Sequence, residues 1–267
     1  MSYKIAFFDM DHTLYQTHQN TIDSRDLAAL EALHQQGVIV CCATGRPFNQ
    51  LNRILAQYNH FDYFVLINGG LVMDHNQKIL AHNPLHFGDV QDIVSWCIQN
   101  DAGLLFHFGI ISTIYTKYDE VYRFCVQHHA ADILNYDENH QDHLQKPAYN
   151  AVCMVKHKED LLKFVESHTN LRYDIIEYSN GYYFIDVFPA DNDKSHGIDT
   201  ILKQEHLTWK DVICFGDSTN DIGMIKQAGL GVAMGNANEA TKLAADVITS
   251  TIEDAGVSQE LLKHFTL

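Results

Sequence analysis

Short runs of apolar residues alternate with amphipathic stretches at both ends of the chain. Near the start, this pattern predicts buried strands at KIAFF (4–8), VIVCCA (38–43) and YFVLI (63–67). A helix is predicted from Ser24 to Gln36, closed by Gly37, and another is entered through Pro47. Near the end, VICFG (212–216), LGVAM (230–234) and DVIT (246–249) repeat the rhythm. Apolar strands separated by helices are typical of βαβ units, so both ends predict one doubly wound α/β domain with a parallel sheet.

The middle of the chain follows a different pattern. From about Lys78 to Phe188 the predicted strands carry alternating and aromatic residues, in GLLFHF, STIYTK, YNAVCMV and GYYFIDVF. Helices are predicted near 89–100, 118–130 and 158–168, and turn signals at 109–110 and 179–181 separate successive strands. Successive strands joined by turns favour antiparallel hairpins. We therefore expect an α+β cap domain at 84–188, inserted into a core domain formed by 1–83 and 189–267.

Composition narrows the setting of these two domains. The chain has 267 residues, 46% of them hydrophobic, and a formal net charge of −16. Such a charge argues against binding to nucleic acid or to an anionic membrane, since both require a basic surface. An apolar run of the ~18 residues that a membrane span needs is absent from the sequence. We expect a partner that is a small molecule, and a chain that is a monomer or a weak homodimer.

The six cysteines indicate a compartment. They form no CxxC pair, and most lie in apolar runs: Cys41, Cys42, Cys97, Cys125, Cys153 and Cys214. We expect buried free thiols rather than a disulfide framework. Met1 to Lys4 leads straight into a short strand, without the pattern of a signal peptide. The expected location is therefore the cytoplasm.

Polar clusters follow three of the predicted core strands. They comprise Asp9, Asp11 and Thr13, then Thr44, Gly45 and Arg46, and finally Asp217, Ser218, Asn220 and Asp221. One such cluster is unremarkable, because Asp, Ser and Thr cap helices and form turns. Three of them on one sheet edge are different, because ligands of open α/β sheets bind outside the carboxyl ends of the strands. The sequence therefore predicts a binding site at that edge.

The charges of these clusters suggest its chemistry. Four carboxylates, those of Asp9, Asp11, Asp217 and Asp221, are tenable at one edge only if a cation compensates them. Hard oxygen ligands suit Mg²⁺ better than zinc, and Mg²⁺ shares its coordination shell with substrate phosphate. The Thr44 hydroxyl, Lys194 and Asn220 are donors that a phosphoryl group could use.

These motifs resemble those of the haloacid dehalogenase (HAD) superfamily, and the layout is similar to its Cof-type phosphatase branch with a class IIB cap. The DxDxT motif of that family stands here as DMDHT, and its second motif, a Thr or Ser closing the next strand, as ATGR. The lysine ahead of a helix matches Lys194 in DNDKSHGI, and GDxxND stands as GDSTND. INGG (67–70) and FIDVFP resemble further stretches of that branch, so the resemblance spans essentially the whole chain.

The resemblance implies a role for each matching residue. Asp9 would be the nucleophile that forms an aspartyl-phosphate, and Asp11 the general acid and base. Asp9, the backbone carbonyl of Asp11 and Asp217 would hold Mg²⁺, with Asp221 supporting the metal site. The phosphoryl group would be bound by Thr44, Gly45, Lys194 and Asn220. One position departs from the family, because His12 stands where members commonly have glycine; if that backbone requires a positive φ, histidine carries modest strain.

Three functions remain open at this point. The first is a Mg²⁺-dependent phosphatase acting on small phosphorylated metabolites, with sugar phosphates as the expected class because the cap type resembles that of such enzymes. The second is a phosphotransferase or phosphomutase, in which an acceptor hydroxyl competes with water. The third is a non-catalytic sensor of phosphorylated metabolites, which would have no need of a nucleophile such as Asp9. In the first two, the cap is expected to close over the sheet edge that carries Asp9.

Overall fold

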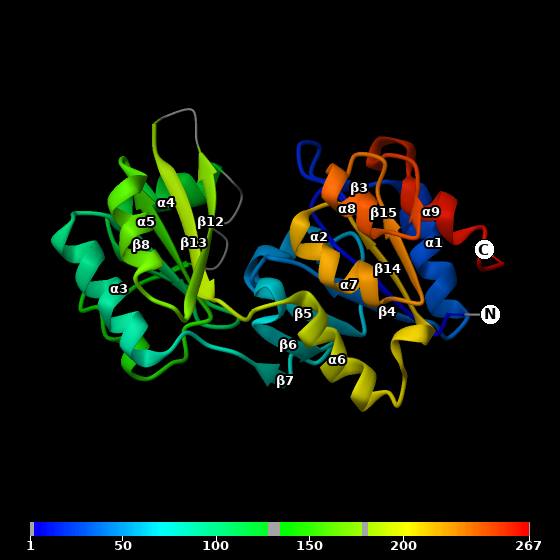
Figure 1. The fold of residues 1–267 in the computed structure, drawn as a ribbon, viewed down its shortest axis with the longest axis horizontal. Helices are drawn as coiled ribbons and strands as arrows, with labels where there is room; N and C mark the ends of the chain where they lie inside the picture. The colour runs from blue at the N-terminus through cyan, green and yellow to red at the C-terminus, as the bar shows by residue number, and fades with distance from the viewer. Residues whose placement is uncertain (1–2, 128–133, 178–180, 267) are drawn as a thin grey trace. The chain divides into compact units, whose positions relative to one another are not determined.

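The computed structural model describes residues 3–127, 134–177 and 181–266. Contacts within the chain divide it into two compact units (Figure 1). The first consists of Met1–Arg46, Leu51–His82 and Asp193–Leu267, and the second of Pro47–Gln50 and Asn83–Asn192. The chain therefore leaves the first unit twice, once briefly and once for about a hundred residues.

The first unit is built on an eight-stranded sheet with the order β16-β15-β14-β1-β4-β5-β6-β7. Its strands are β1 (Ile5–Phe8), β4 (Ile39–Ala43), β5 (Tyr63–Leu66), β6 (Leu71–Asp74), β7 (Ile79–His82), β14 (Val212–Gly216), β15 (Leu230–Ala233) and β16 (Val247–Ile248). A small hairpin pairs β2 (Tyr15–Gln16) with β3 (Thr21–Ile22). The α/β fold with a mainly parallel sheet is thus as predicted.

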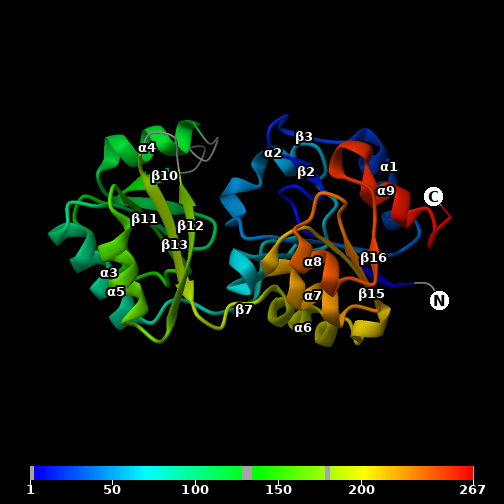
Figure 2. The same cartoon turned by 45° about the horizontal axis from the view of Figure 1, so that its top comes forward.

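Helices cover both faces of this sheet (Figures 1 and 2). They are α1 (Ser24–Gln35), α2 (Asn52–Leu55), α6 (Lys194–Gln204), α7 (Ile222–Gln227), α8 (Glu239–Ala244) and α9 (Gly256–Leu261). Alternate residues of β1 show why: Ile5 and Phe7 pack with Ile198 of α6 and Met224 of α7 in one apolar cluster. All four residues of β1 are fully buried, which explains its continuous apolar run.

Two features, one in the first unit and one where the chain briefly leaves it, differ from the sequence-based expectation. Strands β6 and β7 form an antiparallel extension of the sheet, with β5 paired to β6 and β6 to β7. Pro47 does not open an α-helix, because a 3-10 turn at Phe48–Gln50 comes first and α2 begins only at Asn52. In both places tight turns change the chain direction within a few residues, which the apolar pattern alone does not encode.

The second unit is a six-stranded sheet with the order β10-β9-β8-β11-β13-β12. Its strands are β8 (Gly103–His107), β9 (Ser112–Thr116), β10 (Leu134–Tyr136), β11 (Asn150–Val155), β12 (Leu171–Glu177) and β13 (Tyr183–Pro189). Its helices are α3 (Phe87–Gln99), α4 (Tyr118–Gln127) and α5 (Lys158–Glu166). Two hairpins are present, β8–β9 and β12–β13, with Gly109 and Gly181 at positive φ in the connections. Residues 128–130 of the predicted second helix and 179–180 of the predicted turn lie outside the described residues.

Two composition-based expectations can be compared with the structure. All six cysteines are free and buried, so the prediction of buried thiols is confirmed. Within the described ranges, none of the helices has the length and apolar character that crossing a membrane requires.

Candidate active site

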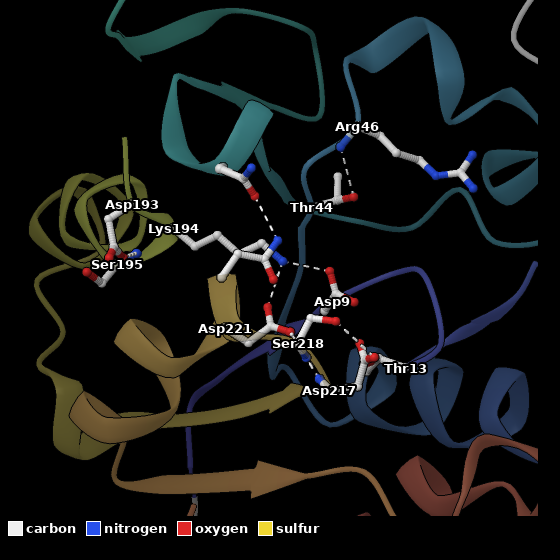
Figure 3. Close-up of polar contacts among 12 residues, drawn as sticks. Asp9, Thr13, Thr44, Arg46, Asp193, Lys194, Ser195, Asp217, Ser218 and Asp221 are labelled. Carbon is white, nitrogen blue, oxygen red and sulfur yellow. Dashed lines mark hydrogen bonds and ion pairs between the residues drawn. The ribbon is translucent and has the colours of Figure 1, made fainter. Parts of the chain in front are cut away.

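A buried lysine links two carboxylates at the carboxyl end of the first sheet (Figure 3). Lys194 Nζ donates to Asp9 Oδ1 at 2.6 Å and to Asp221 Oδ1 at 2.7 Å, and the lysine side chain is fully buried. Asp9 directly follows β1, and its backbone N–H continues the ladder by donating to the Phe215 carbonyl of β14. Lys194 is the first residue of α6, where Asp193 caps the helix by accepting from the Ser195 N–H. The end of β1 and the start of α6 therefore bring the side chains of Asp9 and Lys194 into contact.

The loop after β14 supplies the other carboxylates. Asp221 Oδ2 accepts from the backbone N–H groups of Asp217 and Ser218, both at 3.0 Å, and so closes a capping box around the 3-10 turn Thr219–Asp221. Asp217 in turn accepts from Thr13 Oγ1 at 3.2 Å and from Ser218 Oγ at 3.1 Å. Backbone and hydroxyl donors thus fix the orientation of both carboxylates before any ligand binds.

Burial and mutual repulsion dominate the electrostatics of this cluster. Burial raises the pKa of Asp9 well above its usual range; Lys194 opposes the shift, while Asp221 and Asp217 add to it. Burial also raises the pKa of Asp217, and Asp221 reinforces that shift. Burial alone would lower the pKa of Lys194, but Asp221 and Asp9 outweigh it and hold this pKa above its ordinary value. The ammonium group therefore stays charged.

The same cluster has the donors of a cation site. Oxygen atoms of Asp9, Asp217 and Asp221 all lie within 4.8 Å of one another. Lys194 contacts two of these carboxyl groups, those of Asp9 and Asp221, while Asp217 receives hydrogen bonds only from neutral hydroxyl groups among the described residues, so one ammonium group faces three carboxyl groups. A hard divalent cation such as Mg²⁺ matches both the charge and the all-oxygen donor set. The residues present therefore fit the metal that the sequence led us to expect.

The remaining predicted phosphate ligands surround this cluster on the same edge. Thr44 follows β4, is buried, and its Oγ1 accepts from the Arg46 backbone N–H at 3.1 Å. Asn220 Nδ2 donates to Asn68 Oδ1 at 2.9 Å, which holds the Asn220 amide in place, and Asn220 Oδ1 is buried without a hydrogen-bond partner among the described residues. A Cβ at Gly45 would lie 3.3 Å from Asn68 Oδ1, so glycine keeps this approach open.

The structure separates the Asp11 carboxylate from the Asp9 cluster. Arg46 holds it with a bidentate contact, Nε to Oδ2 at 2.7 Å and Nη2 to Oδ1 at 2.6 Å, and Thr17 Oγ1 donates at 2.9 Å. Figure 3 shows the Arg46 side chain directed away from Asp9 and Asp217. Burial by itself would raise the pKa of Asp11. The hydrogen bonds and the positive charge of Arg46 outweigh burial, so the pKa of Asp11 lies below its ordinary value. In this arrangement Asp11 is an ionised partner of Arg46.

His12 adopts the backbone conformation that the family pattern implied. Its φ is 62°, in the left-handed region that glycine occupies without strain. The His12 backbone N–H donates to the Tyr15 carbonyl, and its own carbonyl accepts from Asn236 Nδ2 at 2.7 Å. These contacts hold the turn, and the exposed imidazole makes no hydrogen bond within the described residues.

Sequence reasoning missed two contributions to this site. The first is Asn68, which has φ 52° and accepts a hydrogen bond from Asn220. Its motif INGG was matched to the family, but no role was predicted for this residue. The sequence did carry a signal for a tight turn at Asn68: the residue follows a predicted strand and precedes two glycines, and asparagine tolerates a positive φ better than most residues. The second is the contact of Arg46 with Asp11, which the sequence does not predict because it depends on side-chain conformation.

Comparisons with known proteins identify the family of the chain. A family model described as haloacid dehalogenase-like hydrolase matches residues 6–261. The chain is 26% identical over 264 residues to the 5-amino-6-(5-phospho-D-ribitylamino)uracil phosphatase YcsE of Bacillus subtilis, covering 99% of this chain and 96% of that one. It is 28% identical over 239 residues to the HMP-PP phosphatase of Serratia proteamaculans, covering 88% of this chain and 85% of that one.

Solved structures resemble the chain over its whole length. A haloacid dehalogenase-like hydrolase from Bacteroides thetaiotaomicron superposes with a TM-score of 0.84 at 25% identity, covering 98% of this chain and 100% of that one. A structure described as a HAD subclass IIB sugar phosphatase gives a TM-score of 0.81 at 26% identity, covering 98% and 99%. The chain belongs to the haloacid dehalogenase-like hydrolase family and is an enzyme of its phosphatase type.

Proposed function

We propose that the chain is a Mg²⁺-dependent phosphatase that hydrolyses small phosphorylated metabolites, with sugar phosphates as the substrate class, through an aspartyl-phosphate on Asp9. The observation that carries this proposal is the Lys194 bridge between Asp9 and Asp221 beside Asp217. A buried ammonium group next to an oriented carboxylate is what a nucleophile needs when it approaches an anionic phosphoryl group. The subclass IIB sugar phosphatase among the similar structures supports the substrate class.

In the first step, an Asp9 carboxylate oxygen attacks phosphorus and the bond to the leaving oxygen breaks. Lys194 fixes the Asp9 side chain through Oδ1 and offsets negative charge at the phosphoryl group. Thr44, Gly45 and Asn220 donate hydrogen bonds to phosphoryl oxygens through hydroxyl, backbone and amide groups. When bound, Mg²⁺ would be held by Asp9, Asp217 and the Asp11 carbonyl, with Asp221 in support, and would supply charge neutralisation.

Asp11 performs the proton transfers in this mechanism. It gives a proton to the leaving alkoxide, and afterwards takes one from the water that attacks the aspartyl-phosphate and releases inorganic phosphate. The carboxylate held by Arg46 is ionised, which suits the second role. For the first role, the ion pair with Arg46 has to open so that Asp11 can take up a proton and reach the leaving oxygen.

The second unit is proposed to act as the cap, with the inserted domain at 84–188, and to select the organic part of the substrate. The core formed by 1–83 and 189–267 carries all the residues that act on the phosphoryl group. We propose a cytoplasmic location, because the six buried free thiols are suited to a reducing compartment.

Turnover of para-nitrophenyl phosphate tests the metal and the reaction together. We expect hydrolysis with Mg²⁺, loss of it in excess chelator, recovery on adding Mg²⁺, and poor replacement by Ca²⁺, which prefers more ligands and looser geometry. Full activity in chelator, or activation by zinc alone, would refute the metal assignment. Absence of any turnover would favour a sensor, and transfer of phosphate to a sugar instead of its release would favour a phosphotransferase.

A further inference from the structure

Three successive residues with positive φ follow β5 in the first unit. They are Ile67, Asn68 and Gly69, with φ of 51°, 52° and 93°. Glycine occupies this region freely and asparagine tolerates it, but a β-branched residue such as isoleucine is rarely found there. Ile67 therefore holds the left-handed conformation against the preference of its side chain. Backbone strain of this kind persists where the surrounding structure holds the residues in place, and it gathers at functional sites.

Backbone hydrogen bonds hold this turn against the loop after β4. The N–H of Ile67 donates to the Arg46 carbonyl at 3.3 Å, and the N–H of Asn68 donates to the Thr44 carbonyl at 3.1 Å. Both acceptors belong to the loop that carries Thr44 and Gly45, two of the proposed phosphate ligands, and the first unit contains both segments. The backbone of the turn is thus fastened to one loop of the candidate active site, which leaves its side chains for other contacts.

The Asn68 side chain joins that loop to the loop after β14. Asn220 Nδ2 donates to Asn68 Oδ1 at 2.9 Å, and the two residues stand 152 positions apart in the sequence. The same Asn68 oxygen lies over Gly45, where an added Cβ would be 3.3 Å from it. Asn68 is only 8% exposed, so water competes little for its amide. One buried side chain therefore contacts two of the loops that carry proposed phosphate ligands.

The contact with Asn68 is the hydrogen bond that orients the Asn220 amide. Asn220 Oδ1 is buried and has no hydrogen-bond partner in the part of the chain that the structure describes, where Nδ2 contacts Asn68 alone. The amide nitrogen carries two hydrogens, so one N–H stays available after Asn68 has accepted the other. Asp217 and Asp221 of the same loop are each held by two donors. Asn220 differs from them, because its direction depends on a single contact.

We propose that Asn68 is a positioning residue of the phosphatase reaction and that it acts through Asn220. The inference rests on the proposed function, in which the Asn220 amide donates to a phosphoryl oxygen. By accepting one N–H, Asn68 fixes the plane of the amide and directs the second N–H to one place in the site. Without this contact, the Asn220 side chain would be ordered only when a phosphoryl group binds, and that ordering weakens binding of substrate and of product phosphate alike.

Asn68→Gly and Asn220→Ala, alone and combined, test the proposal in the full chain. Glycine at position 68 keeps the positive φ and removes only the amide. For para-nitrophenyl phosphate with Mg²⁺, Asn68→Gly should lower kcat/KM about 10-fold, mainly through KM, and should weaken binding of inorganic phosphate by a similar factor. In the Asn220→Ala background, the same change should alter either quantity less than about twofold, because the group through which Asn68 acts is gone.

Gln77→Gly is the matched control for this substitution. Gln77 is another residue of the first unit that is not glycine and has a positive φ, 62°, and it lies in the exposed turn between β6 and β7. Its replacement by glycine should change neither kcat/KM nor the dissociation constant of inorganic phosphate. Cooperative unfolding in urea, measured for every variant, checks that each of them is folded.

The outcomes separate this inference from the proposed function. If Asn68→Gly causes equal losses with and without the Asn220 side chain, Asn68 only supports the turn and the inference is wrong. Unchanged kcat/KM and phosphate binding in Asn68→Gly would overturn it as well. If wild type hydrolyses no aryl phosphate, the phosphatase proposal fails. Calorimetric titration with inorganic phosphate needs no turnover, so the dissociation constants still test whether Asn68 acts through Asn220.

Discussion

Lys194 determines the arrangement of the site at the scale of single residues. An ammonium group removed from water costs several kcal/mol unless it is paired, and Lys194 is fully buried. Its two partners, Asp9 and Asp221, would in turn repel each other without it. Each of the three charges is therefore tenable only because of the other two, and the nucleophile is held in one orientation as a result.

Replacing the nucleophile separates chemistry from stability. Asp9→Asn should abolish turnover of para-nitrophenyl phosphate, with a loss of at least about a thousandfold, because an amide is a poor nucleophile and metal ligand. Thermal unfolding should still be cooperative, since Asp221 continues to pair Lys194. Asp26→Asn is the control: it removes another buried carboxylate of the same unit and should keep normal activity at pH 7. Substantial turnover by purified Asp9→Asn protein would exclude the covalent mechanism.

The sequence was sufficient to bring Asp9, Lys194, Asp217 and Asp221 together as candidates. Asp9 and Asp217 directly follow apolar strands, Lys194 begins a helix and Asp221 precedes one, and the parallel order of the strands takes them to one edge. The Asp11–Arg46 ion pair could not be predicted in the same way. It depends on which of several rotamers two long side chains adopt, and strand patterns carry no information about that choice.

At the scale of elements, the turn after β5 supports the start of α6. Gly69 has φ 93°, and a Cβ there would lie 2.1 Å from the Asp193 carbonyl oxygen and 3.3 Å from the Lys194 nitrogen. Glycine is needed both for the conformation and for the space. The pattern of apolar residues predicted β5 but neither this contact nor the antiparallel β6 that follows, because the reversal is encoded by backbone angles at 67–69.

Gly69→Ala should destabilise the protein by about 3 kcal/mol or more and reduce activity, because the added carbon pushes on the residue that positions Lys194. Gly37→Ala is the matched control. Gly37 also has a positive φ, 76°, but an added Cβ would meet nothing within 4 Å, so only the backbone strain of about 1 kcal/mol remains. Urea midpoints of the two variants measure the difference. If the two variants were destabilised equally, the close approach of residue 69 to the Asp193 carbonyl would contribute nothing to the loss of stability.

Helices α1 and α9 are joined by a buried carboxylate whose ionisation depends on folding. Asp26 Oδ1 accepts from the Ser258 backbone N–H at 2.8 Å, and burial raises the pKa of Asp26 from 3.8 to about 6. Between these values the folded chain keeps a proton that the unfolded chain releases, so stability falls as pH rises through this window and then levels off. The fall amounts to about 3 kcal/mol.

Asp26→Asn should remove that dependence. Relative to wild type, the variant should gain about 2 kcal/mol of unfolding free energy between pH 4 and pH 7, since it has no proton to lose and a small part of the fall in wild type lies below pH 4. Urea unfolding of both proteins at the two pH values measures this difference, and contributions from all other groups cancel in the comparison. If the unfolding free energies of the two proteins changed with pH in the same way, the pKa of Asp26 would have to be the same in the folded and the unfolded chain.

At the scale of the whole molecule, phosphoryl chemistry and substrate selection are assigned to different units. The first unit contains all the charged residues of the candidate active site, and the second unit is the one proposed to select the organic part of the substrate. Each unit has its own buried apolar clusters, which is why their sequence patterns could be told apart. The brief excursion Pro47–Gln50 could not be recognised from sequence, because four residues are too few to carry a pattern.

Replacing residues 84–188 with a short linker should preserve some hydrolysis of para-nitrophenyl phosphate, because the residues that act on phosphorus remain. Discrimination among metabolites should fall strongly, since a site left open to water binds small sugar phosphates weakly. Ranking kcat/KM over a metabolite panel for both proteins is the measurement. An unchanged ranking in the shortened protein would mean that specificity lies in the core.

The pairing of β1 with β14 has a consequence for biosynthesis. Ile5 pairs with Val212, so the strand that carries the nucleophile emerges from the ribosome about two hundred residues before one of its two neighbours. The second unit, whose main segment is continuous, can fold while the first is still incomplete. During that interval the wholly apolar β1 has an unpaired edge that invites aggregation or a chaperone. The nascent chain therefore cannot be active before Lys194 and Asp217 have been added, about two hundred residues after the nucleophile.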